Sequence, residues 1–207
     1  TSCAAEGICK TGACVPTGQQ RLFAKTYAAP ALKSASVVAH APNGEILMAG
    51  CTELKSGSTI KHGVFTLRTD RYGAELARGS NHDKDVDCSN VFGAIGLQAG
   101  ETVIAWNRPS GGSRPNVARF DAAMKLLWRV DPGGSWAYHT VYGSELVARN
   151  GGQLATVVMY RHYSRYGSYN TSVFSRRVTL TTSALGSFVT TKGAANAARY
   201  YPNDSRL

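Results

Sequence analysis

Residues 41–51, APNGEILMAGC, decide the fold class of this chain. Pro42 presets φ for a turn, and Asn43 and Gly44 tolerate positive φ, so the segment begins with a tight turn. The apolar run that follows is too short for a helix, and a glycine bounds it at each end. The pattern predicts a turn followed by a short strand that is buried on both faces.

The same pattern returns twice along the chain. Residues 99–106, AGETVIAW, repeat the turn glycine, the glutamate and the apolar run, and residues 150–158, NGGQLATVV, repeat them more loosely. The matching glycines are Gly44, Gly100 and Gly152, which are 56 and 52 residues apart. Self-similarity at about fifty residues indicates stacked or radial β-repeats.

A second signature has the same period. Leu22, Leu76 and Leu127 each lie in a short stretch of apolar and basic residues, and they are spaced by 54 and 51 residues. Asp70 and Asp121 are 51 residues apart and end the preceding strand. An aspartate at such a position can cap a tight hairpin turn by bonding its own backbone. Each unit is therefore predicted to have four strands, with the units at residues 35–79, 90–131 and 137–191.

These repeats predict an all-β fold, a β-propeller-like array of about three four-stranded antiparallel units, with helix nearly absent from residues 21–191. The alternative is a β-sandwich, which shares the short alternating strands. We divide the chain into a Cys-rich leader and linker (1–20), a repeat domain (21–195) and a C-terminal tail (196–207). Closed propellers have about four to eight blades, so closure stays open. Two chains could form a six-bladed ring, the chain could be part of a longer protein, or the sheets could close differently.

The composition narrows the class of protein. The chain has 207 residues, 43% hydrophobic and only 17% charged, which indicates a folded domain rather than a disordered one. It has no apolar window of about 18 residues, so we expect no transmembrane segment. Thr1 is an unusual natural start, and we expect a mature, processed chain. Lys and Arg outnumber Asp and Glu by 23 to 13, and this formal charge of +10 favours polyanions as partners.

The five cysteines indicate an oxidising compartment. Cys3, Cys9 and Cys14 crowd an N-terminal segment with little apolar content, which holds its shape only if it is cross-linked. Zinc binding is the rival interpretation, although no matching Cys/His spacing follows. Cys51 ends the second strand of unit one and Cys88 precedes the first strand of unit two, so neighbouring units are predicted to bring them into a disulfide. An odd count leaves one cysteine over or pairs it with another chain.

Residues 44–52, GEILMAGCT, are followed by a strand ending in Arg-x-Asp and then by Gly-x-x-Leu. This succession resembles the extracellular SBBP-type β-propeller repeats of bacteria, and the short Cys segment resembles the leaders of myxobacterial-type surface proteins. The resemblance covers residues 21–190 and implies a secreted propeller or propeller-like sheet without catalytic residues. The third unit departs from the pattern, because it lacks the Asp-Gly hairpin signature and carries an insert at residues 159–170.

Three aspartates at alternate positions form a candidate metal site. Asp83, Asp85 and Asp87 could wrap a hard cation such as Ca²⁺ with oxygen ligands. The stretch lacks the glycine and the distal glutamate of a helix-flanked calcium loop. The alternative is a solvated loop between units, in which like charges are kept apart.

The insert of the third unit is a candidate ligand site. Tyrosine offers a flat face for sugars or bases, and arginine offers forked donors for carboxylate, sulfate or phosphate. The alternative is an extended β-hairpin with tyrosine pairs across its strands. The predicted ligand-binding residues are Tyr160, Arg161, His162, Tyr163, Arg165 and Tyr166.

The remaining polar residues favour binding over catalysis. The histidines are scattered and no nucleophile elbow is present. Glu45 and Glu101 occupy equivalent repeat positions, which suits a structural role better than a glycosidase carboxylate pair. We therefore expect a secreted, non-catalytic binding or scaffolding module for an acidic glycan or another polyanion, with no cofactor apart from the Ca²⁺ considered above. The alternative is a secreted hydrolase that acts on a glycan or a nucleic acid.

Overall fold

The computed structural model describes most of the chain. The described residues are 7–10, 13–16, 27, 32–41, 44–108, 114–133, 139–149, 153–165 and 168–190. The side chains of residues 32–36, 139–142 and 160–165 lie outside this description, as do a few others near the ends of sheet three. The predicted strand at residues 21–27 also falls outside it, except for Tyr27, which is not in a strand.

The described residues form three four-stranded antiparallel sheets, each a simple meander in chain order. Sheet one contains β3 (Leu32–His40), β4 (Ile46–Ser56), β5 (Thr59–Thr69) and β6 (Glu75–Asn81). Sheet two contains β7 (Asn90–Gly96), β8 (Thr102–Asn107), β9 (Pro115–Phe120) and β10 (Leu126–Val130). Sheet three contains β11 (His139–Arg149), β12 (Leu154–Arg165), β13 (Ser168–Thr179) and β14 (Leu185–Thr190). The predicted all-β fold of three four-stranded units is confirmed.

Two short elements lie outside the sheets. Strands β1 (Gly7–Lys10) and β2 (Ala13–Pro16) pair as a separate hairpin in the predicted leader, with Cys9 and Cys14 as register partners. A single 3₁₀ turn, η1 (Gln98–Gly100), is the only helical element among the described residues. No helix in this part of the chain has the length and apolarity that a membrane crossing requires.

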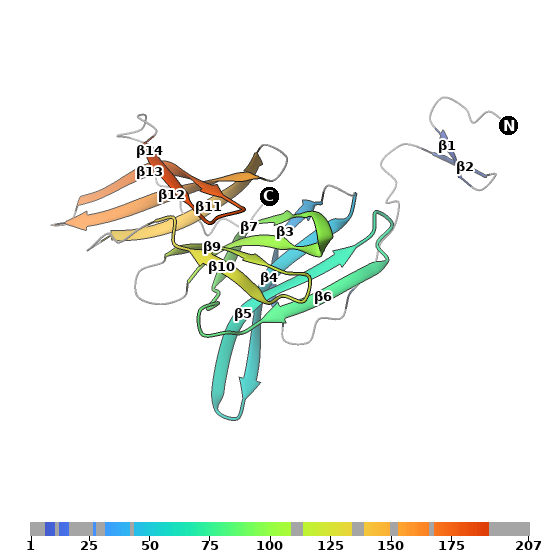
Figure 1. The fold of residues 1–207 in the computed structure, drawn as a ribbon, viewed down its shortest axis with the longest axis horizontal. Helices are drawn as coiled ribbons and strands as arrows, with labels where there is room; N and C mark the ends of the chain where they lie inside the picture. Colours follow the sequence, from blue (N-terminus) through green and yellow to red (C-terminus); the bar gives the residue numbers. More distant parts are fainter. Residues whose placement is uncertain are drawn as a thin grey trace.

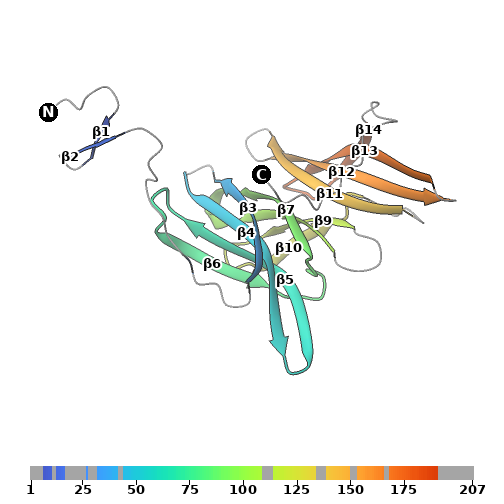
Figure 2. The same ribbon diagram turned by 180° about the vertical axis from the view of Figure 1, so that it is seen from behind.

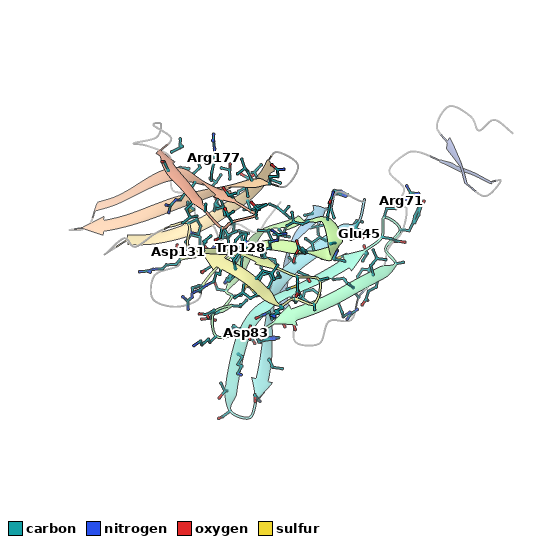
Figure 3. The ribbon with its side chains drawn as sticks, in the orientation of Figure 1. Glu45, Arg71, Asp83, Trp128, Asp131 and Arg177 are labelled. Atoms are coloured by element: carbon teal, nitrogen blue, oxygen red, sulfur yellow. A yellow bond between two sulfur atoms is a disulfide. The ribbon has the colours of Figure 1, made fainter. Side chains whose placement is uncertain are left out.

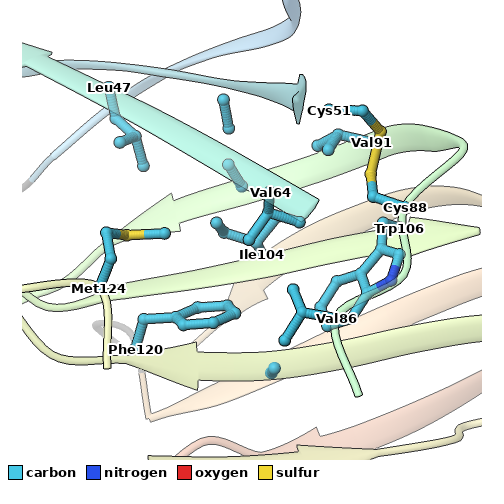
Figure 4. Close-up of a cluster of buried hydrophobic side chains, with 13 residues drawn as sticks. Leu47, Cys51, Val64, Val86, Cys88, Val91, Ile104, Trp106, Phe120 and Met124 are labelled. Atoms are coloured by element: carbon cyan, nitrogen blue, oxygen red, sulfur yellow. A yellow bond between two sulfur atoms is a disulfide. The ribbon is translucent and has the colours of Figure 1, made fainter. Parts of the chain in front are cut away.

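Sheet two lies between the other two sheets (Figures 1 and 2). One apolar cluster fills the space between sheets one and two and includes Leu47, Ile104 and Phe120 (Figure 4). A second cluster fills the space between sheets two and three and includes Val103 and Val157. Every residue of β8 is buried, since alternate side chains of a strand point to opposite faces. The stack of open sheets is consistent with a propeller-like array and with a sandwich.

The predicted turns are present at equivalent positions. Gly44 and Gly100 both have φ of 81°, in the left-handed region that glycine enters without strain. Asp70 Oδ1 accepts hydrogen bonds from the backbone N–H groups two and four residues later, at 2.8 and 2.7 Å. Asp121 Oδ1 does the same at 2.9 and 2.8 Å. The repeated turn chemistry read from the sequence is therefore present in sheets one and two.

The predicted disulfide between Cys51 and Cys88 is confirmed. Their Cα atoms are 5.6 Å apart, and both residues are buried in the cluster between sheets one and two (Figure 4). Cys51 belongs to β4, whereas Cys88 belongs to the connector at residues 82–89 that leads into β7. The bond therefore joins sheet one to the entry of sheet two.

Candidate functional site

The candidate residues lie at the same end of the strands in their own sheets, which we call the hairpin edge, although the β4–β5 hairpin and the outer ends of β12 and β13 point in different directions (Figures 1 and 2). It consists of the β4–β5 hairpin (residues 53–62), the connector (82–89) and the outer halves of β12 and β13 (160–165 and 168–173). The Cys51–Cys88 disulfide joins the first two of these segments. Asn107, at the same end of sheet two, exchanges hydrogen bonds of 3.1 and 2.9 Å with the backbone of Gly143 in sheet three. Register then pairs Gly143 with Met159, directly before residues 160–165.

The β4–β5 hairpin extends beyond the rest of sheet one (Figures 1 and 2). Gly57 has φ of 61° at its tip, as a tight two-residue hairpin turn requires. Leu54 is 46% exposed and Ile60 is 52% exposed, and Lys55 and Lys61 are exposed beside them. Leu54 is the register partner of Lys61, and Lys55 is the partner of Ile60. Each face of the hairpin therefore presents one apolar and one cationic side chain to solvent.

The tyrosine-rich insert is a pair of strands, not a loop. The backbone of β12 runs without interruption through Arg165 and pairs with β13 as far as the partners Arg165 and Ser168. Strand β11 adds a third strand and a second ladder, as far as the partners His139 and Tyr163. Alternating tyrosines favour such an extended backbone. Of the six predicted ligand-binding residues, the structure places five, Tyr160, Arg161, His162, Tyr163 and Arg165, in one continuous strand, and Tyr166 lies outside the described residues.

The three aspartates of the predicted calcium site have separate surroundings. Asp83 Oδ2 accepts a hydrogen bond of 3.2 Å from Asn81, and Asp85 forms an ion pair of 3.5 Å with Arg129. Among the described residues, no group of three or more His, Cys, Asp or Glu side chains could hold a metal ion. The geometry therefore gives a calcium site at Asp83, Asp85 and Asp87 no support.

Side chains of sheet two hold this connector in place by donating hydrogen bonds to its backbone carbonyls. Trp106 Nε1 donates to the carbonyl oxygen of Asp87 at 3.0 Å, and Arg129 Nη1 donates to the carbonyl oxygen of Asp85 at 3.0 Å. Ser89 donates to the carbonyl oxygen of Asn107 through both its N–H and its hydroxyl, each at 2.8 Å. These hydrogen bonds attach the connector to sheet two, and the disulfide attaches it to sheet one. We therefore call the connector at residues 82–89 the clip.

His82 is the first residue of this connector and lies against Gly63 of β5, next to the β4–β5 hairpin. A side chain at Gly63 would collide with the carbonyl oxygen of Asn81 and with the ring of His82, so the two segments are in close contact. His82 Nε2 is buried and has no hydrogen-bond partner among the described residues. Burial lowers the pKa of His82, and the charge of Lys61 lowers it further, although Asp83 acts in the opposite direction. The lowered pKa is therefore mainly a consequence of burial at the base of the hairpin.

The pKa of His82 predicts how stability responds to acid. The unfolded histidine titrates near about pH 6.5, and the folded one takes up its proton only at lower pH. Stability from this group is therefore full above about pH 6.5 and falls as pH drops below that value. We expect His82→Gln to reduce the loss of melting temperature between about pH 7 and pH 5, measured by differential scanning fluorimetry. Equal losses in the variant and the wild type would contradict this.

The glutamates at repeat-equivalent positions each form an ion pair with an arginine of their own sheet. Glu45 forms an ion pair with Arg68 of β5, and Glu101 forms one with Arg119 of β9, whose Nε lies 3.1 Å from Glu101 Oε2. These glutamates have the structural role that their repeat positions predicted. The contact of Arg119 with the neighbouring sheet was not predicted. Arg119 Nη1 also donates to the carbonyl oxygen of Leu180, which directly follows β13 of sheet three, at 3.0 Å. The Arg-x-Asp pattern, which places Arg68 and Arg119 two residues before a turn aspartate, is the sequence signal that could have indicated this contact.

Searches with the whole chain give no relative from which to transfer a role. No model of a known protein family matches the chain, and no curated protein matches it.

Proposed function

We propose that this chain is an extracellular binding module that holds an acidic polysaccharide along the hairpin edge. The observation that carries the proposal is the projecting β4–β5 hairpin, which presents exposed Lys55 and Lys61 beyond the body of sheet one (Figure 1). A protruding cationic arm can reach a long, flexible polyanion without a deep pocket, and its attraction depends on salt.

The charges on the hairpin itself support an anionic partner, whereas the neighbouring connector is acidic, with Asp83, Asp85 and Asp87 beside Lys84. Glu53, the one acidic residue in the hairpin, is engaged by His62 at 3.3 Å. Lys84 is exposed on the neighbouring connector, and Figure 3 shows Asp83 beside the base of the hairpin.

The strands of sheet three add a second cationic segment at the same edge. Arg161 and Arg165 lie on β12, beyond the last row that packs on sheet two. Two separated cationic segments suit an extended polymer better than a small ligand. Once the polymer has bound one segment, its effective concentration at the other segment is raised. The disulfide supports an oxidising compartment, and hence an extracellular polymer.

We expect Lys55→Ala combined with Lys61→Ala to weaken binding of heparin, used as the sulfated polysaccharide probe, by about 5- to 10-fold at low salt. The reason is the loss of two charge contacts of about 1 kcal/mol each or less. The slope of log Kd against log salt should also fall, by about one for each lost contact. Isothermal titration calorimetry at several salt concentrations measures both quantities.

The matched control is Arg71→Ala combined with Lys125→Ala. Both residues are exposed and lie in the β5–β6 and β9–β10 turns, at the other end of the strands from the β4–β5 hairpin; Figure 3 labels Arg71. It should leave heparin affinity nearly unchanged, whereas Arg161→Ala with Arg165→Ala should weaken it. If the control weakens binding as much as the hairpin variant, the attraction is a general effect of net charge and the proposed site is wrong. Cleavage of the probe would instead favour a hydrolase.

A further inference from the structure

The two interfaces between neighbouring sheets contain an equivalent pair of register partners, one apolar residue and one arginine. In sheet one, Leu47 is the register partner of Arg68, and both face sheet two. In sheet two, Val103 is the partner of Arg119, and Val103 packs against sheet three. In both cases the arginine lies two residues before an aspartate that caps the next turn. The stack therefore repeats one interface, with an arginine at the same place in each copy.

Each of these arginines reaches the turn of the following sheet. Arg119 Nη1 donates to the carbonyl oxygen of Leu180, which follows β13. Arg68 Nη1 lies beside Gly100 and Ala122, in the turns of sheet two, and a side chain at Gly100 would meet it. The arginine is thus the polar part of an otherwise apolar interface between successive sheets.

Sheet three repeats this row on its outer face. Thr156 is the register partner of Arg177, and Arg177 lies two residues before Thr179 at the end of β13. Ala155 and Val157 are buried against sheet two, so Thr156 and Arg177 face away from it. Arg177 is exposed (Figure 3).

The rest of this outer face is largely β-branched and accessible. Val158 is the register partner of Glu145 and of Ser175, and Ser175 is the partner of Val189, so these four residues form one row across the sheet. Val189 is 59% exposed, and Glu145 is also exposed. The face therefore has two valines in one row and the arginine of a packed interface in the next, together with an exposed carboxylate.

The opposite end of the stack is already covered in part. Leu67 and Thr69 are the register partners of Met48 and Ile46, so they face away from sheet two. They are nevertheless only 2% and 0% exposed. Tyr27 lies at the same end of sheet one and donates its hydroxyl to the carbonyl oxygen of Gly73 at 2.6 Å. Of the two outer faces, the one on sheet three is the more accessible.

We propose that the outer face of sheet three binds the same face of a second copy, forming a two-fold symmetric dimer. Within the chain, the arginine-bearing face of one sheet packs on the opposite face of the next. The equivalent receiving face of a second copy would be the outer face of sheet one, which is already covered at Leu67 and Thr69, so the same face of sheet three is the accessible partner. In a two-fold symmetric interface the same surface is used by both copies, so that if residue i of one copy contacts residue j of the other, then j also contacts i. The surface must therefore be complementary to itself. Glu145 and Arg177 provide opposite charges on that surface, and the assembly closes at two copies.

The test is sedimentation velocity of the full chain between about 1 and 200 µM. We expect a species of twice the 22.1 kDa chain mass, with a dissociation constant that Val189→Lys raises at least tenfold. Val189 is exposed, so this change should leave the melting temperature of the monomer unchanged. The matched control is Val38→Lys, which alters an exposed valine (68%) of sheet one and should leave the dimer intact.

Charge exchange tests the symmetric arrangement separately. Arg177→Glu and Glu145→Arg should each weaken the dimer, and the double variant should restore it. A monomer throughout the concentration range overturns the proposal. So does a dimer that Val38→Lys disrupts and Val189→Lys does not, because that result would place the contact on sheet one. A double variant as weak as the single ones overturns the two-fold pairing.

Discussion

Replacing Cys51 and Cys88 by serine together should lower the free energy of unfolding by about 3–4 kcal/mol. The bond joins residues that are 37 positions apart, and in the chain-entropy model a cross-link over a loop of this length restrains the unfolded chain by about that amount. Both residues are buried, and the connector that carries Cys88 clips onto sheet two. Chemical denaturation of the double variant measures the loss, and the melting temperature should fall by about 10 °C.

The cysteines of the leader provide the control. A variant with serine at Cys3, Cys9 and Cys14 should melt within about 2 °C of the wild type, because Cys9 and Cys14 lie in the separate β1–β2 hairpin. Adding a reductant to that variant should then reproduce the loss seen in the Cys51 and Cys88 variant. If reduction leaves its melting temperature unchanged, the disulfide does not support the fold.

The parts of the fold that could be predicted are those set by local chemistry. A turn needs a residue that accepts positive φ, so Gly44 and Gly100 mark its position in the sequence. Asp70 and Asp121 cap their turns through atoms only two to four residues away. Because such signals depend on short stretches, their recurrence located all three units and placed the two cysteines at neighbouring ends.

In the third unit, the sequence pattern does not give the correct register. The sequence aligns Gln153 with Glu45 and Glu101, but the register does not. Thr156 pairs with Arg177 as Val103 pairs with Arg119, so Leu154 occupies the position of the glutamate. A one-residue shift exchanges the two faces of a strand, and only packing against sheet two decides between them. The outer face of sheet three could not be identified from the sequence for this reason.

The site residues named from the sequence remain predictions, and the contacts around them could not be foreseen. Alternating aspartates have the spacing of oxygen ligands, but at Asp85 and Asp87 the backbone carbonyls make the close contacts. Those contacts come from Arg129 and Trp106, 44 and 19 residues away, and no local pattern reveals them. The projecting hairpin was missed as well, because Leu54 and Ile60 look like core residues in a sequence.

Trp106→Ala should be the most damaging single substitution in sheet two, lowering the free energy of unfolding by about 3–5 kcal/mol. Trp106 is fully buried between sheets one and two, with its ring centroid 6.3 Å from that of Phe120 (Figure 4). Removing the indole leaves a cavity in a close-packed cluster. It also removes the donor to the carbonyl oxygen of Asp87, so the clip at residues 82–89 loses one of its attachments.

Two matched variants separate these contributions, and urea denaturation followed by far-UV circular dichroism measures all three. Trp106→Phe keeps most of the ring volume but loses the hydrogen bond, so it should cost about 1–2 kcal/mol. Trp128→Ala removes a half-buried tryptophan from the edge strand β10, whose Nε1 has no hydrogen-bond partner among the described residues. It should cost clearly less than Trp106→Ala, because the site is open on one side and can collapse or fill with water. Equal losses for Trp106→Ala and Trp128→Ala would mean that the layer between sheets one and two is not the main core.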